Sequence, residues 1–122
     1  MSDTIEMVDK LLTDLKKAGG VIACAAASRD GLLIRAIMQK EQYVESLAAM
    51  SATMLGAAET ATTHVEMGIP TRLIVESDHG KLIVVGAGPK ALLILLTSPD
   101  IGLGLVLLEL DKSAKKLKEI LT

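Results

Sequence analysis

Aromatic side chains are nearly absent from this chain of 122 residues: Tyr43 stands alone, and there is no Phe and no Trp. Without aromatic residues the chain offers no platform on which the bases of single-stranded nucleic acid can stack. Its net charge of −2 also lacks the basic excess that marks binding to nucleic-acid phosphates. We therefore expect no nucleic-acid partner, and a core built from Leu, Ile, Val, Ala and Met.

Cysteine is almost as scarce, because Cys24 is the only one. A single cysteine excludes an internal disulfide and is typical of proteins in a reducing compartment. The first residues, MSDTIEMVDK, carry acids and no apolar run of the kind found in signal peptides. The most apolar stretch, 91–110, is interrupted by Ser98-Pro99-Asp100, so it predicts no membrane insertion. We expect a cytoplasmic protein.

The length predicts one domain over residues 1–122. Hydrophobic periodicity and turn residues divide it into elements in the order αββαβββα. Helices are expected at 3–18, 42–66 and 101–121, the last of them capped by Asp100. Strands are expected at 21–28, 32–38, 71–76, 81–87 and 91–97.

Short turns between the strands predict an antiparallel, five-stranded sheet. Strands 21–28 and 91–97 are apolar on both faces and belong in its centre, whereas charged residues mark 32–38 and 71–76 as edges. With the strands numbered along the chain, the sheet order 2-1-5-4-3 satisfies both conditions. The fold class is α/β (α+β): a three-layer α/β/α sandwich with the long helix on one face and the terminal helices on the other.

Residues 46–58 of the long helix carry no charge. A surface helix of a soluble domain normally carries charges opposite its buried stripe, so this helix must be covered on two sides. We predict that the sheet covers one side and that a second copy of the chain covers the other, in a homodimer of two-fold symmetry. The expected interface residues lie on this helix and on strand 71–76, whose edge pairs with its copy: Leu47, Ala49, Met50, Thr53, Met54, Gly56, Ala57, Thr60, Ala61, Thr71, Leu73 and Val75.

Two stripes of the long helix compete for the sheet. One candidate for the sheet-facing core follows helical spacing through Leu47, Met50, Met54, Ala57, Ala61 and Val65. The other is a small-residue face that a second backbone can approach closely, formed by Ala49, Thr53, Gly56, Thr60 and Thr63. Spacing alone does not decide which stripe faces the sheet and which faces the partner.

No pattern predicts a catalytic, cofactor or metal site. His64 and His79 have no Cys or second His at metal-ligand spacing, and nothing near Cys24 in the sequence would lower its pKa. Residues 86–90, GAGPK, lack the full spacing of a phosphate loop and precede a strand, so they indicate a hairpin turn. No polar cluster is present to line a pocket, and we expect no small-molecule substrate.

The arginines allow two interpretations. Arg29, Arg35 and Arg72 fit solvated or edge-blocking positions. Alternatively, an arginine of this chain could stabilise phosphoryl charge in a partner's active site.

Several segments, in this order, resemble the Roadblock/dynein light chain (Roadblock/LC7) family, close to its bacterial and archaeal polarity-regulator-like members. They are Gly20-Val21, Ser28-Arg29-Asp30-Gly31-Leu32, the Ala-rich central helix, TRLIVE at 71–76, and Leu103-Gly104-Leu105-Val106 leading to Leu110, Ala114 and Leu117. Together they span nearly the whole chain.

The resemblance implies a partner that the residues alone do not. Members of the family typically bind Ras-like small GTPases, often on the dimer face that carries the central helices, and some stimulate GTP hydrolysis. We therefore expect a homodimeric regulator or scaffold of a Ras-like GTPase that is not itself an enzyme. The alternative is a purely structural dimerisation adaptor in a larger assembly, with no effect on nucleotide turnover.

Overall fold

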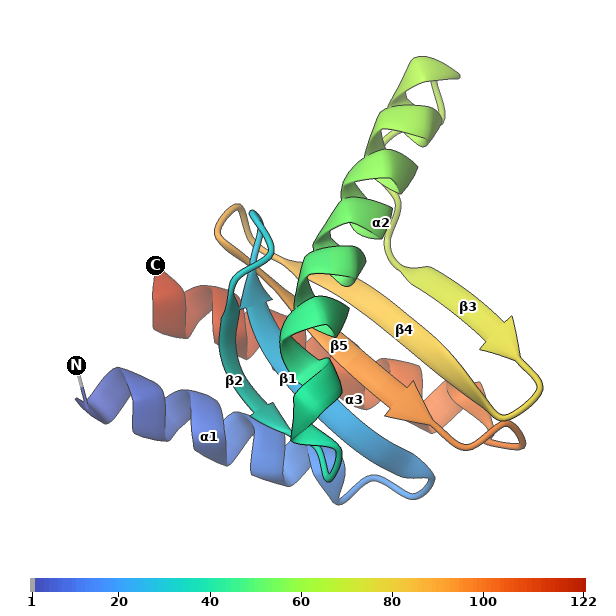
Figure 1. Cartoon of the computed structure of the whole chain (residues 1–122). Coiled ribbons are helices and arrows are strands. Elements are labelled where there is room, and N and C mark those ends of the chain that lie inside the picture. The colour runs from blue at the N-terminus through green and yellow to red at the C-terminus, as the bar shows by residue number, and fades with distance from the viewer. Residues whose placement is uncertain (1) are drawn as a thin grey trace.

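The computed structural model describes residues 2–122 as a mixed α/β structure in three layers (Figure 1). Its helices are α1 (Ser2–Lys16), α2 (Val44–His64) and α3 (Leu103–Leu121), with a short 3₁₀ turn at Glu41–Tyr43 before α2. Its strands are β1 (Val21–Ser28), β2 (Leu33–Ile37), β3 (Leu73–Ser77), β4 (Gly80–Ala87) and β5 (Ala91–Thr97). The predicted order αββαβββα is confirmed.

The strands form one antiparallel sheet in the order β2-β1-β5-β4-β3, as the sequence predicts. β1 and β5 pair along their length, from Val21 opposite Thr97 to Ser28 opposite Ala91. These central strands must be apolar on both sides because helices cover both faces of the sheet. β2 and β3 form the two edges of the sheet.

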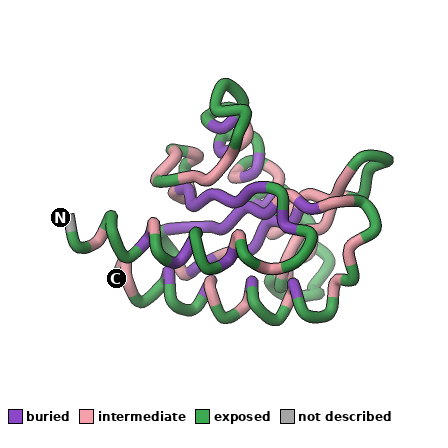
Figure 2. The backbone as a smooth tube through the Cα atoms, turned by 90° about the horizontal axis from the view of Figure 1, so that it is seen from below, coloured by how far each residue is buried: buried purple, intermediate pink, exposed green. Residues whose placement is uncertain are grey.

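The helices α1 and α3 lie side by side on one face of the sheet (Figure 1). Their buried leucines and valines, among them Leu12, Leu110 and Leu117, pack on Ile83 and Leu93 of the sheet in the larger of two cores. Helix α2 covers the other face with a smaller core. Figure 2 shows the buried residues concentrated in the strands between these helical layers.

β1 has the sequence VIACAAAS, and its small side chains set how closely α2 packs. The residues that α2 buries are also mostly small: Val44, Ala48, Ser51 and Leu55. Ala25 and Ala27 of β1 lie in the same core as Ala48 of α2. Small side chains of the helix therefore face small side chains of the strand. Close approach of the two backbones follows from this pairing.

Three elements begin two residues later than the sequence predicts, and the first two helices end two residues earlier, at Lys16 and His64. The long helix begins at Val44 rather than Gln42, because 41–43 form a 3₁₀ turn, and β3 begins at Leu73 rather than Thr71. The last helix begins at Leu103, with Gly102 in an extended conformation as its N-cap and no side-chain cap, so Asp100 does not cap it. The physical reason is Ile101, which packs against the larger core instead of entering the helix.

Gly20 makes room for Ile101. Its φ of +87° is in the left-handed region, and a Cβ there would lie 2.7 Å from Cδ1 of Ile101. The positive φ therefore favours a glycine directly before β1.

Cys24 is buried between β1 and α1, where its thiol donates a hydrogen bond to the Leu12 carbonyl at 3.3 Å. Burial raises the pKa of this thiol to about 11, although nearby Lys16 acts in the opposite direction. The thiol therefore stays protonated at neutral pH and is a poor nucleophile. Its role is to fill the space between helix and sheet.

This pKa predicts an alkaline loss of stability. An unfolded cysteine ionises near pH 9 and folded Cys24 near pH 11. Above pH 9 the folded state thus holds the extra proton, and stability falls as pH rises. Between pH 8 and pH 10 we expect Cys24 to cost about 1 kcal/mol of the free energy of unfolding. Urea denaturation at pH 8 and at pH 10 gives the free energy of unfolding that is lost between the two. This loss should be about 1 kcal/mol smaller in Cys24→Ala than in the native chain. Equal losses in both proteins would contradict it.

Candidate functional site

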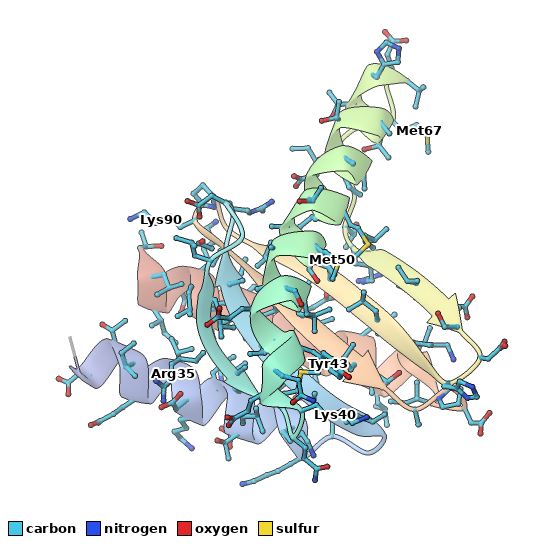
Figure 3. All side chains as sticks on the ribbon, viewed as in Figure 1. Arg35, Lys40, Tyr43, Met50, Met67 and Lys90 are labelled. Carbon is cyan, nitrogen blue, oxygen red and sulfur yellow. The ribbon has the colours of Figure 1, made fainter. Side chains whose placement is uncertain are left out.

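The side of α2 that faces away from the sheet is exposed and has no charged residue between Ser46 and Ala58. We name this surface the outer face of α2, and its exposed members are Ala49, Met50, Thr53, Gly56, Ala57, Thr60 and Ala61. Met50 is 56% exposed, and Figure 3 shows it on α2 without cover. A soluble helix normally places charges on such a surface, so the outer face has the composition of an interface core.

Neither predicted stripe faces the sheet. The candidate core stripe through Leu47, Met50 and Val65 does not face the sheet, because Met50 and Val65 are more than half exposed. Only its flanking member Leu47 packs partly against the smaller core. A third stripe, through Val44, Ala48, Ser51 and Leu55, is buried instead, and its Ala48 lies in the same core as the small side chains of β1. Both predicted stripes therefore contribute to the outer face.

The second half of α2 extends beyond the sheet (Figure 1). Within the described chain, α2 has no buried residue after Leu55. The segment that follows α2 is strongly apolar and uncovered, with Val65, Met67 and Ile69 exposed by 58%, 76% and 78%. Figure 3 shows Met67 near the far end of this extension. A helix of this length holds little stability in water without packing, so a covering surface is expected.

β3 follows this extension along the chain and forms one edge of the sheet. It pairs with β4 from Leu73 opposite Val84 to Ser77 opposite Gly80, and in residues 2–122 its other edge has no partner. Leu73 and Val75 are half-buried, and Leu73 packs against the smaller core on the α2 side of the sheet. Thr71 is exposed in the link before the strand. Because side chains alternate along a strand, Val75 lies on the same face of the sheet as Leu73, which is the face that α2 covers.

Arg29, in the turn between β1 and β2, fixes α2 over the sheet. Its Nη1 donates to both carboxylate oxygens of Glu59 on α2, at 3.0 and 3.2 Å. Its Nε and Nη2 donate to the Gly88 carbonyl in the turn between β4 and β5, at 3.1 and 2.9 Å. The guanidinium therefore joins the β1–β2 turn and the β4–β5 turn to α2, at a position just beyond Leu55, the last buried residue of the helix. We call this set of contacts the Arg29 clamp.

Gly31 lies beside the clamp and touches the same flank of α2. Its φ is +92°, and a Cβ there would lie 3.1 Å from the Cα of Ala49. One predicted interface residue, Ala49, is thus in part a contact for the chain's own turn. Because successive helical residues rotate by about 100°, Met50 and Ala61 lie on the side of α2 opposite Glu59. The clamp therefore turns the methionine side of the outer face away from the β1–β2 turn.

All three arginines are held in ion pairs within the chain. Besides the clamp, Arg35 of β2 contacts Asp9 of α1 at 2.8 Å, and Arg72 contacts Asp111 of α3 at 3.0 Å. The hydrogen bond to Asp9 raises the pKa of Arg35 further above its already high ordinary value. The predicted solvated role is therefore too simple, because each arginine joins two elements.

Within residues 2–122 no group of three or more His, Cys, Asp or Glu is placed to hold a metal ion. In the same range, no helix is both long and apolar enough to cross a membrane. His64 and His79 are exposed and lie in different parts of the fold. The arrangement is suited to binding through the outer face of α2 and the β3 edge.

Comparisons with known proteins agree with this architecture. The family model described as Roadblock/LC7 domain matches residues 7–97. Two uncharacterized proteins of Methanocaldococcus jannaschii, MJ1340 and MJ0310, are each 31% identical over 112 residues, which is 92% of this chain and 97% of theirs.

Solved structures show the same fold at lower identity. Myxococcus xanthus MglB superposes with a TM-score of 0.87 at 19% identity, covering 96% of this chain and 89% of that one. A Roadblock/LC7 domain from Streptomyces avermitilis superposes with a TM-score of 0.86 at 20% identity, covering 93% and 96%.

The clamp predicts a stability effect out of proportion to its surface position. Both side chains are less than one third exposed, so Arg29→Ala leaves the Glu59 carboxylate and the Gly88 carbonyl without this donor. We expect a loss of about 2 kcal/mol in the free energy of unfolding, measured by urea denaturation. The matched control is Lys10→Ala, which removes the exposed pair with Asp14 and should cost under about 0.5 kcal/mol. Similar losses in the two variants would contradict the role of the clamp.

Proposed function

The chain belongs to the Roadblock/LC7 domain family, and on that premise we propose that it is a homodimeric regulator or scaffold that binds a Ras-like small GTPase. The observation that carries the proposal is the uncharged, exposed outer face of α2. The class of partner comes from the family resemblance of the sequence. We propose no catalytic site in the chain itself.

The dimer is supported by what α2 leaves uncovered. Its outer face and its extension past Leu55 are uncovered on one side of the sheet, and β3 forms a free edge of that sheet (Figure 1). A two-fold axis brings the same patch of two chains together, and small residues such as Gly56 and Ala57 let two helices approach closely. Antiparallel pairing of two β3 edges would extend the sheet and remove an exposed edge. One contact would thus cover all three features.

The GTPase would then bind across the paired α2 helices. An arginine supplied by this chain to the nucleotide is disfavoured, because Arg29, Arg35 and Arg72 are all engaged in ion pairs. Any acceleration of GTP hydrolysis would therefore come from positioning the GTPase's own residues. The same observation favours the second candidate, a structural dimerisation adaptor without effect on nucleotide turnover.

The dimer can be tested with one substitution. Ala57→Glu places a carboxylate in the centre of the outer face, where burial in a dimer would leave the charge unpaired. We expect sedimentation to show a monomer at concentrations where the native chain is a dimer. The control is Thr13→Glu, which adds the same charge to the exposed side of α1 and should stay dimeric. A folded Ala57→Glu protein that remains dimeric would refute this interface.

The GTPase proposal is tested by single-turnover hydrolysis. Ras-like GTPases of the same organism, loaded with GTP, are followed with and without an excess of this protein. Acceleration of tenfold or more that persists in Arg35→Ala and is lost in Ala57→Glu would support activation through the dimer. Unchanged hydrolysis with binding that depends on GTP would support a scaffold. If the protein is a dimer but binds none of these GTPases, the GTPase proposal is refuted and the structural adaptor is supported.

A further inference from the structure

β2 forms the sheet edge opposite β3, and it pairs with only part of β1. It pairs with β1 from Leu33 opposite Ala27 to Ile37 opposite Cys24. The first residues of β1, 21–23, therefore have no partner on this side in the described chain. Ile22 lies in this unpaired stretch and is 53% exposed. The β2 edge thus continues into a step in the sheet, where the first residues of β1 have no strand beside them on this side.

An open groove of about 640 Å³ follows this edge. Consecutive residues of the chain from Leu33 to Gln39 form its floor. Lys16, at the end of α1, lies on one wall, and Glu41, Val44 and Glu45, at the start of α2, lie on the other. Figure 1 shows β2 between these two helices.

The two walls carry opposite charges. Lys16 is on the α1 side, whereas Glu41 and Glu45 are on the α2 side. These three residues take no part in the ion pairs found within residues 2–122. The charge of each wall therefore remains available to a ligand. Neighbouring Lys40 does not line the groove.

The side chains of β2 show how an added strand would sit. Arg35 points to α1, where it binds Asp9, and Ile37 packs in the core on that side. Ala36 and Met38 pack in the core on the α2 side. A β-bulge at Ile34 interrupts the alternation of β2, so that Ile34 and Arg35 both face the α1 side, and strict alternation begins at Arg35. A strand placed outside residues 35–38 would alternate in the same way, with every second side chain facing Lys16 and the others facing Glu41 and Glu45.

We propose that the β2 edge binds an extended segment of a partner protein as an added strand of the sheet, with acidic and basic residues in alternation. Main-chain hydrogen bonds to β2 supply the affinity, and the two charged walls select the sequence. Acidic side chains face Lys16, and basic side chains face Glu41 and Glu45. The site is at the opposite end of the sheet from β3, so it does not depend on the dimer or on a GTPase.

A second copy of the chain fits this groove poorly. β2 itself, LIRAI, carries one charged residue, Arg35, which is already paired with Asp9. It offers no acidic side chain to Lys16. Charge complementarity therefore favours a different protein.

Two labelled peptides of identical composition test the proposal. One has eight residues with Lys and Glu alternating, and the other has the same residues in two blocks. In a strand the first places each charge on its own face, whereas the second mixes them. In titrations followed by fluorescence anisotropy we expect the alternating peptide to bind about tenfold more tightly. Amide signals of residues 33–37, and not of 73–77, should shift in NMR spectra. Equal binding of both peptides, or shifts confined to β3, would overturn the proposal.

Charge-swap variants provide the second test. Lys16→Glu makes both walls acidic, and the pair Glu41→Lys with Glu45→Lys makes both walls basic. Each change should weaken the alternating peptide about three- to tenfold, and the triple variant should restore binding, because the peptide can exchange its two faces. Thermal unfolding within a few degrees of the native chain shows that each variant is folded. Binding that the triple variant does not restore would refute wall recognition. Assembly beyond a dimer that the peptide blocks would assign the groove to a second copy instead.

Discussion

The position of α2 depends on the hydrogen bonds of Arg29. Up to Leu55, apolar contacts with the sheet hold the helix, but beyond that residue the described chain buries none of its side chains. Beyond Leu55, the Arg29–Glu59 pair attaches the helix to the sheet, and the Gly88 carbonyl accepts hydrogen bonds that fix the guanidinium in place. The buried stripe up to Leu55 decides which side of α2 remains open, and the Arg29 clamp holds the helix in that orientation where the stripe ends.

The nearly complete lack of aromatic residues has its counterpart in the packing. The central strand VIACAAAS has small side chains, and α2 packs on it closely through Ala48 and Ser51, which leaves little space for rings between them. The bulk of the core lies on the other side, where leucines of α1 and α3 meet β4 and β5. The two layers are thus unequal. The helix layer with the smaller core is also the one whose outer face lacks charge.

Much of this architecture could be predicted, because it follows from patterns along the chain. Alternation and charge placed β2 and β3 at the edges and β1 and β5 in the centre, and the sheet order followed. Helical spacing could not decide which stripe of α2 is buried, since Met50 and Ala48 are both compatible with a core and the choice between them depends on how the helix packs on β1. The Arg29 clamp could not be predicted either, because Arg29 and Glu59 are far apart in sequence and neither belongs to a periodic pattern. The groove beside β2 arises from where β2 leaves β1, which no local signal marks.

Tyr43 has an optical consequence. It is the only aromatic residue of the chain, and it is 53% exposed in the 3₁₀ turn between Glu41 and Val44. Near-ultraviolet absorbance and intrinsic fluorescence of the protein thus come from a single phenol at the start of α2, at one end of the β2 groove. The leucine-rich core is spectroscopically silent, and the light emitted by the native chain reports on one junction rather than on the fold as a whole.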